Sequence, residues 1–216
     1  MIIAIDGPSA SGKSTTAKGV AKKLGITHLD TGAMYRAVTL GLIQAGIAHE
    51  EKEKVCQYLS EMEIVFDTLN QIHLNGKNVS AEIRTGEISS RVSATSALLE
   101  VREEMVKIQR KIANGNDCVL EGRDIGTVVF PNADYKYFLI ADVKIRAKRR
   151  LSELEKIGET KTILESIEDI KRRDYLDSTR DYSPLTQAED AISIDTSNIT
   201  IDEQINKIVN QINHNK

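Results

Sequence analysis

The chain has 216 residues, 40% of them hydrophobic, and its 29 Lys and Arg residues nearly balance its 32 Asp and Glu residues. This length suits one large domain or a core with insertions, and the charge balance excludes an overall basic field for nucleic acid or an anionic membrane. No window approaches the roughly 20 apolar residues of a membrane span, and no signal peptide is recognisable. We expect a cytoplasmic protein whose partners include neither nucleic acid nor a membrane.

The cysteines and histidines give no sign of a disulfide or a metal cluster. Cys56 and Cys118 are far apart and lack CxxC spacing, so free thiols in a reducing compartment are expected. None of the four histidines has a partner at metal-ligand spacing, and each is expected to be an ordinary surface or core residue. They are His28, His49, His73 and His214.

A glycine-rich stretch at residues 7–14, GPSASGKS, follows a short apolar run at residues 2–6. It has the G-x-x-x-x-G-K-[ST] pattern of a phosphate-binding loop, the P-loop. Its glycines allow backbone angles that bring main-chain N–H groups close to a phosphate, with the positive end of a helix behind them. Lys13 is expected to place its charge between the β- and γ-phosphates, and Ser14 to ligate Mg²⁺.

The context of this loop supports the same interpretation. It opens a stretch to Leu24 whose apolar residues recur at helical spacing. A plain turn between strand and helix needs neither the lysine nor the hydroxyl, so binding of a nucleoside triphosphate is expected. The residues expected to contact ATP are Gly7, Pro8, Ser9, Ala10, Ser11, Gly12, Lys13, Ser14, Thr15 and, later in the chain, Arg149.

The next elements alternate in type. A short strand at residues 26–29 leads to a helix that Asp30 or Thr31 can cap and that runs to Gly46. A more polar helix follows at residues 50–62.

The pattern then changes to period two. Residues 63–80 alternate apolar and polar positions around two turns, which predicts a small antiparallel insertion. Residues 80–114 are expected to form two helices, with the break among the serines of residues 89–96.

The second half returns to alternating strands and helices. We expect strands at residues 118–122, 136–141 and 191–195, helices at 143–157, 162–179 and from 200 onward, and a loop from 123 to 131. This alternation predicts an α/β fold with a doubly wound parallel sheet covered on both faces. Ligands in such sheets bind at the carboxyl ends of the strands, where the P-loop falls.

Arginines cluster near the expected strand and helix ends. Arg173, Asp177 and Arg180 fall at i, i+4 and i+7, on one side of a helix. The spacing fits a solvated salt-bridge stripe, and it also fits the wall of a site for two phosphorylated ligands, whose like charges repel. Forked guanidinium groups would neutralise both phosphates and fix their angle for in-line attack.

A second basic group lies on the helix expected at residues 143–157. Arg146, Arg149 and Arg150 share one helical face. Two interpretations remain open, a charged surface helix and a mobile lid that closes over the triphosphate and excludes water.

Six segments, in this order, together resemble the bacterial cytidylate kinases. They are DGPSASGKS at 6–14, DTGAMYR at 30–36, EIRT at 82–85, EGRDIGTVVFP at 121–131, RRD at 172–174 and SPL at 183–185. The resemblance runs along nearly the whole chain, and the GRD-x-GTVVFP stretch is particularly specific. It implies a P-loop fold of the nucleoside monophosphate kinase type. The implied parts are a core at about 1–35, 115–145 and 181–216, a monophosphate-binding region with a β insertion at about 36–114, and a helical lid at about 146–170.

The resemblance also implies an activity and a set of roles. The activity is transfer of the ATP γ-phosphoryl group to CMP or dCMP, with Mg²⁺, by a monomer. Carried over by position, the implied catalytic groups are Lys13, Arg123 and Arg180, and the acceptor phosphate is held by Arg36, Arg123 and Arg180. The ribose is contacted by Arg173 and Asp177, and the cytosine is recognised by Ser93, Arg102 and Asp124. Thr31 and Tyr35 complete the implied substrate contacts.

The cytosine assignment has a chemical basis. A carboxylate accepts from the cytosine amino group, and an arginine donates to the ring nitrogen and carbonyl. Uracil would face Asp124 with an unpaired carbonyl, at a cost of roughly 1–3 kcal/mol. Taken alone, Ser93 is equally well explained as a helix-surface hydroxyl.

Two departures from the pattern stand out. Many relatives have Asp where this chain has Glu121, near the expected metal, so the longer side chain leaves the role of this position open. Thr31 replaces a serine found in some relatives and keeps the hydroxyl.

Two rival functions remain at this point. One is a P-loop kinase for UMP, AMP or a non-nucleotide acceptor, in which Arg102 and Asp124 would have no base to read. The other is a switch or binding module of the GTPase kind, which needs D-x-x-G and N-K-x-D motifs that the sequence lacks.

Overall fold

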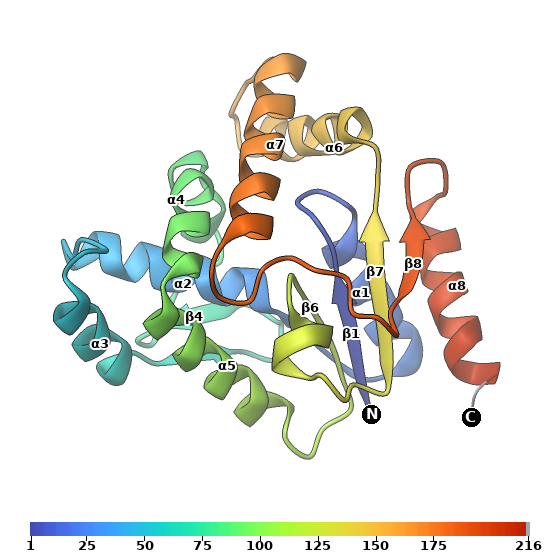
Figure 1. The fold of residues 1–216 in the computed structure, drawn as a ribbon, viewed down its shortest axis with the longest axis horizontal. Coiled ribbons are helices and arrows are strands. Elements are labelled where there is room, and N and C mark those ends of the chain that lie inside the picture. The colour runs from blue at the N-terminus through green and yellow to red at the C-terminus, as the bar shows by residue number, and fades with distance from the viewer. Residues whose placement is uncertain (215–216) are drawn as a thin grey trace. The chain divides into compact units, whose positions relative to one another are not determined.

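The structure is a computed structural model and describes residues 1–214. The chain divides into two compact units, shown in Figure 1. The first, here called the core unit, comprises Met1–Asp30 and Ile112–Lys216, and the second, the inserted unit, comprises Thr31–Lys111. None of the helices between residues 1 and 214 combines the length and apolar character that a membrane crossing requires.

Five parallel strands form the sheet of the core unit, in the order β2-β6-β1-β7-β8. They are β1 (Ile2–Asp6), β2 (Thr27–Asp30), β6 (Cys118–Gly122), β7 (Tyr135–Ile140) and β8 (Ile192–Asp195). The chain forms β2 and then β6 on one side of β1, with β6 between the two, and β7 and β8 on the other side, which makes the end of β1 the switch point where such sheets bind ligands. The doubly wound parallel sheet predicted from the sequence is confirmed.

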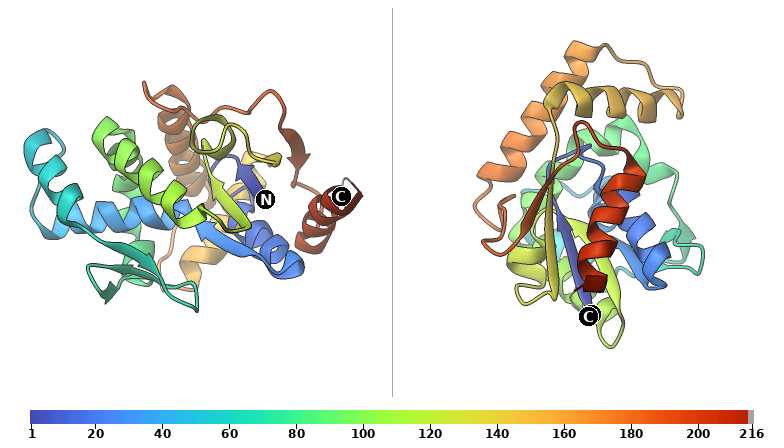
Figure 2. Two further views of the ribbon diagram at one scale, coloured as in Figure 1. Left: turned by 90° about the horizontal axis from the view of Figure 1, so that it is seen from below. Right: turned by 90° about the vertical axis from the view of Figure 1, so that its right-hand side faces the viewer.

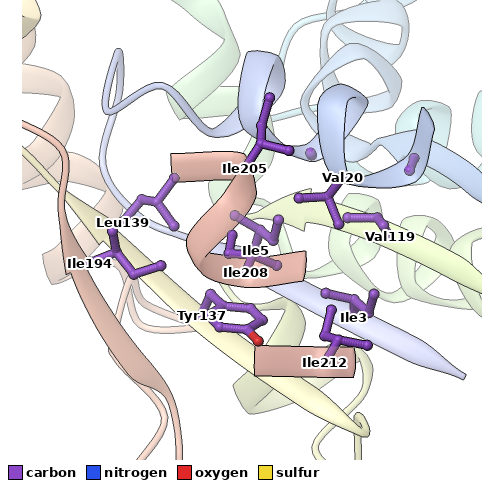
Figure 3. Packing of buried hydrophobic residues seen from close by; sticks show 12 residues of the cluster. Ile3, Ile5, Val20, Val119, Tyr137, Leu139, Ile194, Ile205, Ile208 and Ile212 are labelled. Atoms are coloured by element: carbon purple, nitrogen blue, oxygen red, sulfur yellow. The ribbon is translucent and has the colours of Figure 1, made fainter. Parts of the chain in front are cut away.

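Four long helices accompany this sheet. They are α1 (Lys13–Leu24), α6 (Val143–Glu155), α7 (Ile163–Thr179) and α8 (Ile201–His214). Figure 3 shows α1 and α8 on one face, where Val20, Ile205 and Ile208 pack against Ile3 and Ile5 of β1. Figure 2 shows α6 and α7 beyond the carboxyl ends of the strands. The P-loop therefore lies at the same end of the sheet as these two helices.

The other face of β1 holds a feature that the sequence prediction missed. Residues 123–131 were expected to form a loop, but Ile125–Val129 form a π-helical turn. Its bonds include Val129 N to Asp124 O at 3.1 Å. Asp6 stabilises the turn, because its two carboxylate oxygens accept the N–H groups of Ile125 at 2.9 Å and Gly126 at 2.8 Å. Burial raises the pKa of Asp6 to about 6, although these two bonds oppose the rise.

The inserted unit combines helices with a small sheet. Its elements are α2 (Thr31–Gln44), α3 (Lys52–Glu61), β3 (Ile64–Phe66), β4 (Ile72–Leu74), β5 (Lys77–Asn78), a 3₁₀ turn (Glu82–Arg84), α4 (Gly86–Ala97) and α5 (Leu99–Ala113). The strands form one antiparallel sheet, β3-β4-β5. The antiparallel insertion predicted at residues 63–80 is confirmed.

One predicted helix break and the placement of one arginine on a helix are wrong. The serines of α4 do not break the helix, because their hydroxyls bond carbonyls of the same helix, as Ser96 Oγ does to Ser93 O at 3.0 Å. The break falls instead at Leu98, which is extended. Arg180 was placed on the helix of Arg173 and Asp177, but α7 ends at Thr179 and Arg180 is extended.

Candidate active site

The P-loop joins β1 to α1 with a backbone that requires glycine at two points. Gly7 has φ +149°, and a Cβ there would lie 2.2 Å from Leu139 O in β7. Gly12 has φ +95° and directly precedes α1, so no side chain caps the first N–H groups of that helix. Ala10 is also held at a positive φ of 57°. A loop with these angles and open N–H groups at a helix start is suited to bind an anion.

Lys13 is buried beneath the loop, and its ammonium donates to Pro8 O at 2.7 Å. Burial lowers the pKa of Lys13 below its ordinary value, and the positive charge of Arg123 lowers it further. An ammonium that has lost its water gains most from a nearby anion. The lysine is therefore suited to a phosphate chain lying in the loop.

Ser14 is the next residue and lies against a carboxylate. Its hydroxyl donates to Glu121 Oε2 at 2.5 Å, and His28 Nε2 lies 3.0 Å from Glu121 Oε1. A hydroxyl and a carboxylate are oxygen groups of the kind that Mg²⁺ prefers. No group of three or more His, Cys, Asp or Glu side chains within residues 1–214 is arranged to hold a metal.

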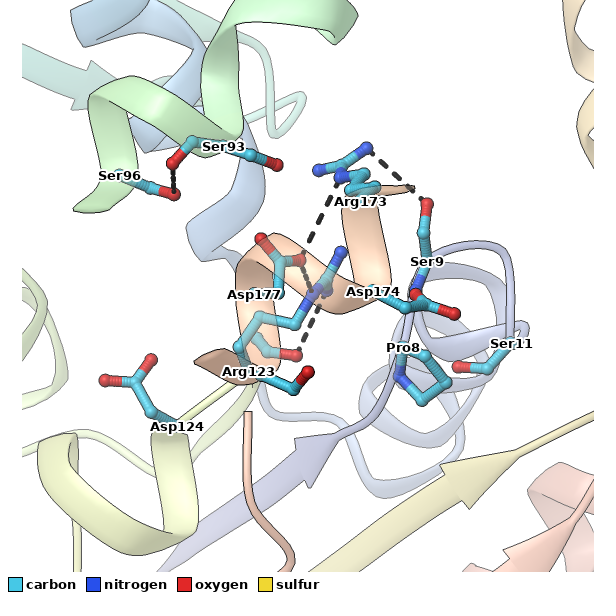
Figure 4. Close-up of polar contacts among 12 residues, drawn as sticks. Pro8, Ser9, Ser11, Ser93, Ser96, Arg123, Asp124, Arg173, Asp174 and Asp177 are labelled. Atoms are coloured by element: carbon cyan, nitrogen blue, oxygen red, sulfur yellow. Dashed lines mark hydrogen bonds and ion pairs between the residues drawn. The ribbon is translucent and has the colours of Figure 1, made fainter. Parts of the chain in front are cut away.

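Arg123, at the end of β6, is paired with α7. Its Nε donates to Asp177 Oδ2 at 2.9 Å (Figure 4). Burial alone would lower the pKa of Arg123, but the charge and hydrogen bond of Asp177 raise it above its ordinary value. Burial would raise the pKa of Asp177, but Arg123 and then Arg173 lower it. Both side chains are therefore charged and fixed.

Arg173 shares the carboxylate less closely. Its Nε lies 4.0 Å from Asp177 Oδ2, and its Nη1 donates weakly to Ser9 Oγ of the P-loop at 3.5 Å, as Figure 4 shows. Burial, followed by the charge of Arg123, lowers the pKa of Arg173 to about 10. Two largely buried guanidinium groups share the carboxylate of Asp177, so an anionic ligand would be attracted to them.

Asp124 and Arg180 form a second, looser pair. Arg180 Nη2 lies 3.9 Å from Asp124 Oδ1, with the two side chains only 5% and 4% exposed. Arg180 Nε donates to Ser183 O at 2.7 Å, which holds the chain after α7. The structure thus brings together the core-unit residues that the sequence assigned to the acceptor.

The three arginines of α6 have separate partners. Arg146 donates to Asp174 Oδ2 at 2.6 Å and to Ser9 O at 3.2 Å, and Arg149 donates to Thr196 O at 2.6 Å. Arg150 pairs with Glu153 on its own helix at 3.1 Å. Arg146 and Arg149 therefore contact the P-loop and the end of β8, whereas the pair of Arg150 with Glu153 lies within α6.

The inserted unit carries the other predicted contacts. Arg102 lies over the ring of Tyr35, 5.3 Å from its centroid, and donates to Ser96 O at 3.1 Å. Arg36 donates to Ser89 Oγ at 2.9 Å and to Ile83 O at 3.1 Å. Ser93 is buried on α4, so it is not a helix-surface hydroxyl, and Thr31, at the start of α2, is buried too.

Two residues of the site were missed by sequence reasoning. His28 was treated as an ordinary histidine, and Asp174 only as part of a motif, although Asp174 accepts Ser9 N at 3.3 Å and binds Arg146. For His28 a signal becomes readable only once the register of the strands is known. It alternates with Asp30 at the end of β2, and Asp30 lies opposite Glu121 in β6, so His28 and Glu121 share a face.

A parallel sheet with a P-loop after β1 and a group of buried arginines beyond the strand ends defines a P-loop phosphotransferase. The sequence profile of one family, described as Cytidylate kinase, matches residues 3–214. This chain belongs to the cytidylate kinase family.

Individual comparisons agree with this membership. The chain is 48% identical over 213 residues to a cytidylate kinase of Clostridioides difficile (strain 630), covering 99% of this chain and 98% of that one. It is also 48% identical to a cytidylate kinase of Caldanaerobacter subterraneus subsp. tengcongensis, over 99% and 95% of the two chains. A solved shikimate kinase of Bacteroides thetaiotaomicron has a similar fold, with a TM-score of 0.53, 12% identity and coverage of 99% and 98%.

Proposed function

We propose that this chain transfers the γ-phosphoryl group of ATP to CMP or dCMP, giving ADP and CDP or dCDP. One observation carries the proposal: a P-loop with a buried lysine lies in the same unit as two groups of ion pairs, one that joins Arg123 and Arg173 to Asp177 and one that joins Arg180 to Asp124. A protein that only binds ATP would not need these arginines in addition to the P-loop. Family membership gives the acceptor its identity.

The donor is bound by the P-loop. Residues 7–15 surround the phosphate chain, Lys13 bridges the β- and γ-phosphates, and Arg149 completes the ATP contacts. The open N–H groups at the start of α1 and the depressed pKa of Lys13 support this role. As negative charge shifts toward the β-phosphate during transfer, Lys13 stabilises it from a site without bulk water.

The acceptor is bound through its phosphate, ribose and base. Arg36, Arg123 and Arg180 hold the phosphate, and Lys13, Arg123 and Arg180 are the catalytic groups. Arg173 and Asp177 contact the ribose, Ser93, Arg102 and Asp124 read the cytosine, and Thr31 and Tyr35 complete the contacts. The pKa of Arg173, which burial and then the charge of Arg123 lower, supports this assignment, because two phosphate chains brought together need more positive charge than one.

The chemistry requires little beyond alignment and charge. The acceptor phosphate is already anionic and nucleophilic, so no general base has to remove a proton from it. The arginines offset the repulsion between attacking and transferred groups and hold them in line. Exclusion of water then prevents loss of the phosphoryl group by hydrolysis, which is the role we assign to a lid at residues 146–170.

The proposal includes Mg²⁺ as cofactor. Ser14 is its expected protein ligand, and the carboxylate of Glu121 beside it supports the assignment. When bound, the ion neutralises charge on the β- and γ-phosphates. We further propose that the protein is a cytoplasmic monomer; Cys56 and Cys118 are free thiols.

A coupled assay tests the proposed function. ATP is supplied with CMP, dCMP, UMP or AMP in turn, and ADP release is followed, with ATP alone as control. We expect CMP and dCMP to exceed UMP in kcat/KM by at least about ten-fold, as the base contacts predict. Equal turnover of all acceptors, or ADP release without an acceptor, would contradict the proposal.

A further inference from the structure

His28 is buried on β2 and contacts a residue of the neighbouring strand. Its Nε2 lies 3.0 Å from Glu121 Oε1, and both side chains are at least nine-tenths buried. Because a carboxylate can only accept, the proton of this contact belongs to His28 Nε2. Histidine therefore donates, and one oxygen of Glu121 is fixed in place.

The other oxygen of Glu121 receives a second proton. Ser14 Oγ donates to Glu121 Oε2 at 2.5 Å. A hydroxyl has one proton and two lone pairs. With its proton directed to Glu121, Ser14 keeps its lone pairs for another partner, so His28, Glu121 and Ser14 form a continuous chain that sets the direction of the hydroxyl.

We propose that His28 is a positioning residue for the magnesium part of the reaction. It holds Glu121, and Glu121 in turn orients Ser14 so that the hydroxyl can ligate Mg²⁺. The inference rests on the proposed function and deepens it, because it assigns a role to a histidine that touches neither nucleotide.

The length of Glu121 explains why such a residue is needed. A glutamate side chain has three rotatable torsions, and ordering it costs conformational entropy. The hydrogen bond from His28 fixes this side chain before any ligand arrives. Groups that orient a metal-binding residue in this way typically change metal affinity 10- to 100-fold when they are removed.

Two substitutions of His28 separate positioning from packing. His28→Leu removes the donor and keeps an apolar side chain of similar bulk, whereas His28→Gln keeps an amide N–H near the position of Nε2. The measurement is calorimetric binding of the β,γ-imido analogue of ATP, with and without Mg²⁺. We expect the factor by which Mg²⁺ tightens binding to fall about ten-fold in His28→Leu, to recover in His28→Gln, and metal-free affinity to stay unchanged in both.

A matched control and a double variant complete the test. His73→Leu removes a comparable histidine–carboxylate pair, with Asp67 at 3.1 Å, and should leave the magnesium factor unchanged. Glu121→Asp shortens the side chain beyond the reach of His28, so adding His28→Leu to it should have no further effect. If Glu121→Asp alone does not change the factor by which Mg²⁺ tightens binding, Glu121 does not connect His28 to Ser14 and the inference fails.

The outcomes keep the two proposals distinct. Additive effects in the double variant, equal loss of metal-free and metal-bound affinity, or failure of His28→Gln to recover would overturn the role of His28, even with full activity on CMP. Absence of CMP phosphorylation by the unaltered protein would overturn the proposed function instead, whatever the magnesium factor shows.

Discussion

Arg123 Nε donates to Asp177 Oδ2 over 2.9 Å, and the two side chains are only 18% and 5% exposed. The contact joins the end of β6 to the last turn of α7, 54 residues later in the chain. Both charges have lost most of their water, so each depends on the other for its stability. The same arginine is proposed to hold the acceptor phosphate, which makes this ion pair a link between the stability of the protein and its activity.

Asp177→Asn should therefore destabilise the ligand-free protein. It leaves a buried guanidinium without its counter-charge, and breaking a buried pair in this way costs about 3 kcal/mol. Chemical denaturation followed by circular dichroism measures the loss. Asp169→Asn is the control, because Asp169 pairs with Arg172 and Lys161 on the exposed side of the same helix and should change stability by less than about 1 kcal/mol. Equal effects of the two variants would show that the Arg123–Asp177 pair contributes no more to the free energy of unfolding than an exposed ion pair does.

Lys13→Met should lower the activity of the protein without lowering its stability, unlike Asp177→Asn. Loss of one preorganised charge at the transferred group typically lowers kcat by about 10²–10³. The ligand-free Tm should stay the same or rise, because the buried ammonium is held at a depressed pKa and its removal relieves desolvation. Lys22→Met, at the exposed end of α1, is the matched control and should keep full kcat. A large fall in the Tm of Lys13→Met would mean that the lysine stabilises the loop itself.

Asp124→Asn should reduce the preference for CMP over UMP. An amide can donate as well as accept, so it no longer penalises the carbonyl that uracil presents where cytosine has an amino group. We expect the ratio of kcat/KM values for the two acceptors to fall about ten-fold, measured in the coupled assay. Asp202→Asn, in the exposed first turn of α8, should leave the ratio unchanged. An unchanged ratio in Asp124→Asn would remove Asp124 from the base-reading set.

The parts of the molecule that were predicted well depend on local patterns. Residues 2–14 carry a strand, a loop motif and a helix start in one short segment, and residues 63–80 alternate with period two around turns. Each pattern needs only neighbouring residues to be satisfied. The doubly wound parallel sheet then follows from the general rules of alternating α/β chains.

The missed features depend on contacts between distant segments. The π-helical turn at Ile125–Val129 needs the carboxylate of Asp6, about 120 positions earlier, and the role of His28 needs Glu121 in the neighbouring strand. Neither pairing can be read from the sequence until the register of β1, β2 and β6 is known. Local propensity also misplaced the break in residues 80–114, because serine hydroxyls that commonly end helices are satisfied here within α4.

Asp6 should give the protein a characteristic dependence of stability on pH. Its pKa is about 6 in the folded chain, raised by burial, against an ordinary value of 3.8. Between roughly pH 4 and 6 the folded chain therefore retains a proton that the unfolded chain has released. The resulting stabilisation is complete below pH 4 and is lost as the pH rises through 6, by up to about 3 kcal/mol.

Asp6→Asn isolates this contribution, because an amide does not titrate. The free energy of unfolding of both proteins is measured by urea denaturation from pH 4.5 to 7.5, and the difference between the two curves is taken at each pH. As the pH rises, the free energy of unfolding of the unaltered protein should fall relative to that of Asp6→Asn. Asp177 does not interfere, because its pKa is lowered and the stability it contributes is lost only at more acidic pH. Parallel curves across this range would mean that Asp6 is ionised throughout, with its two backbone hydrogen bonds outweighing the cost of burial.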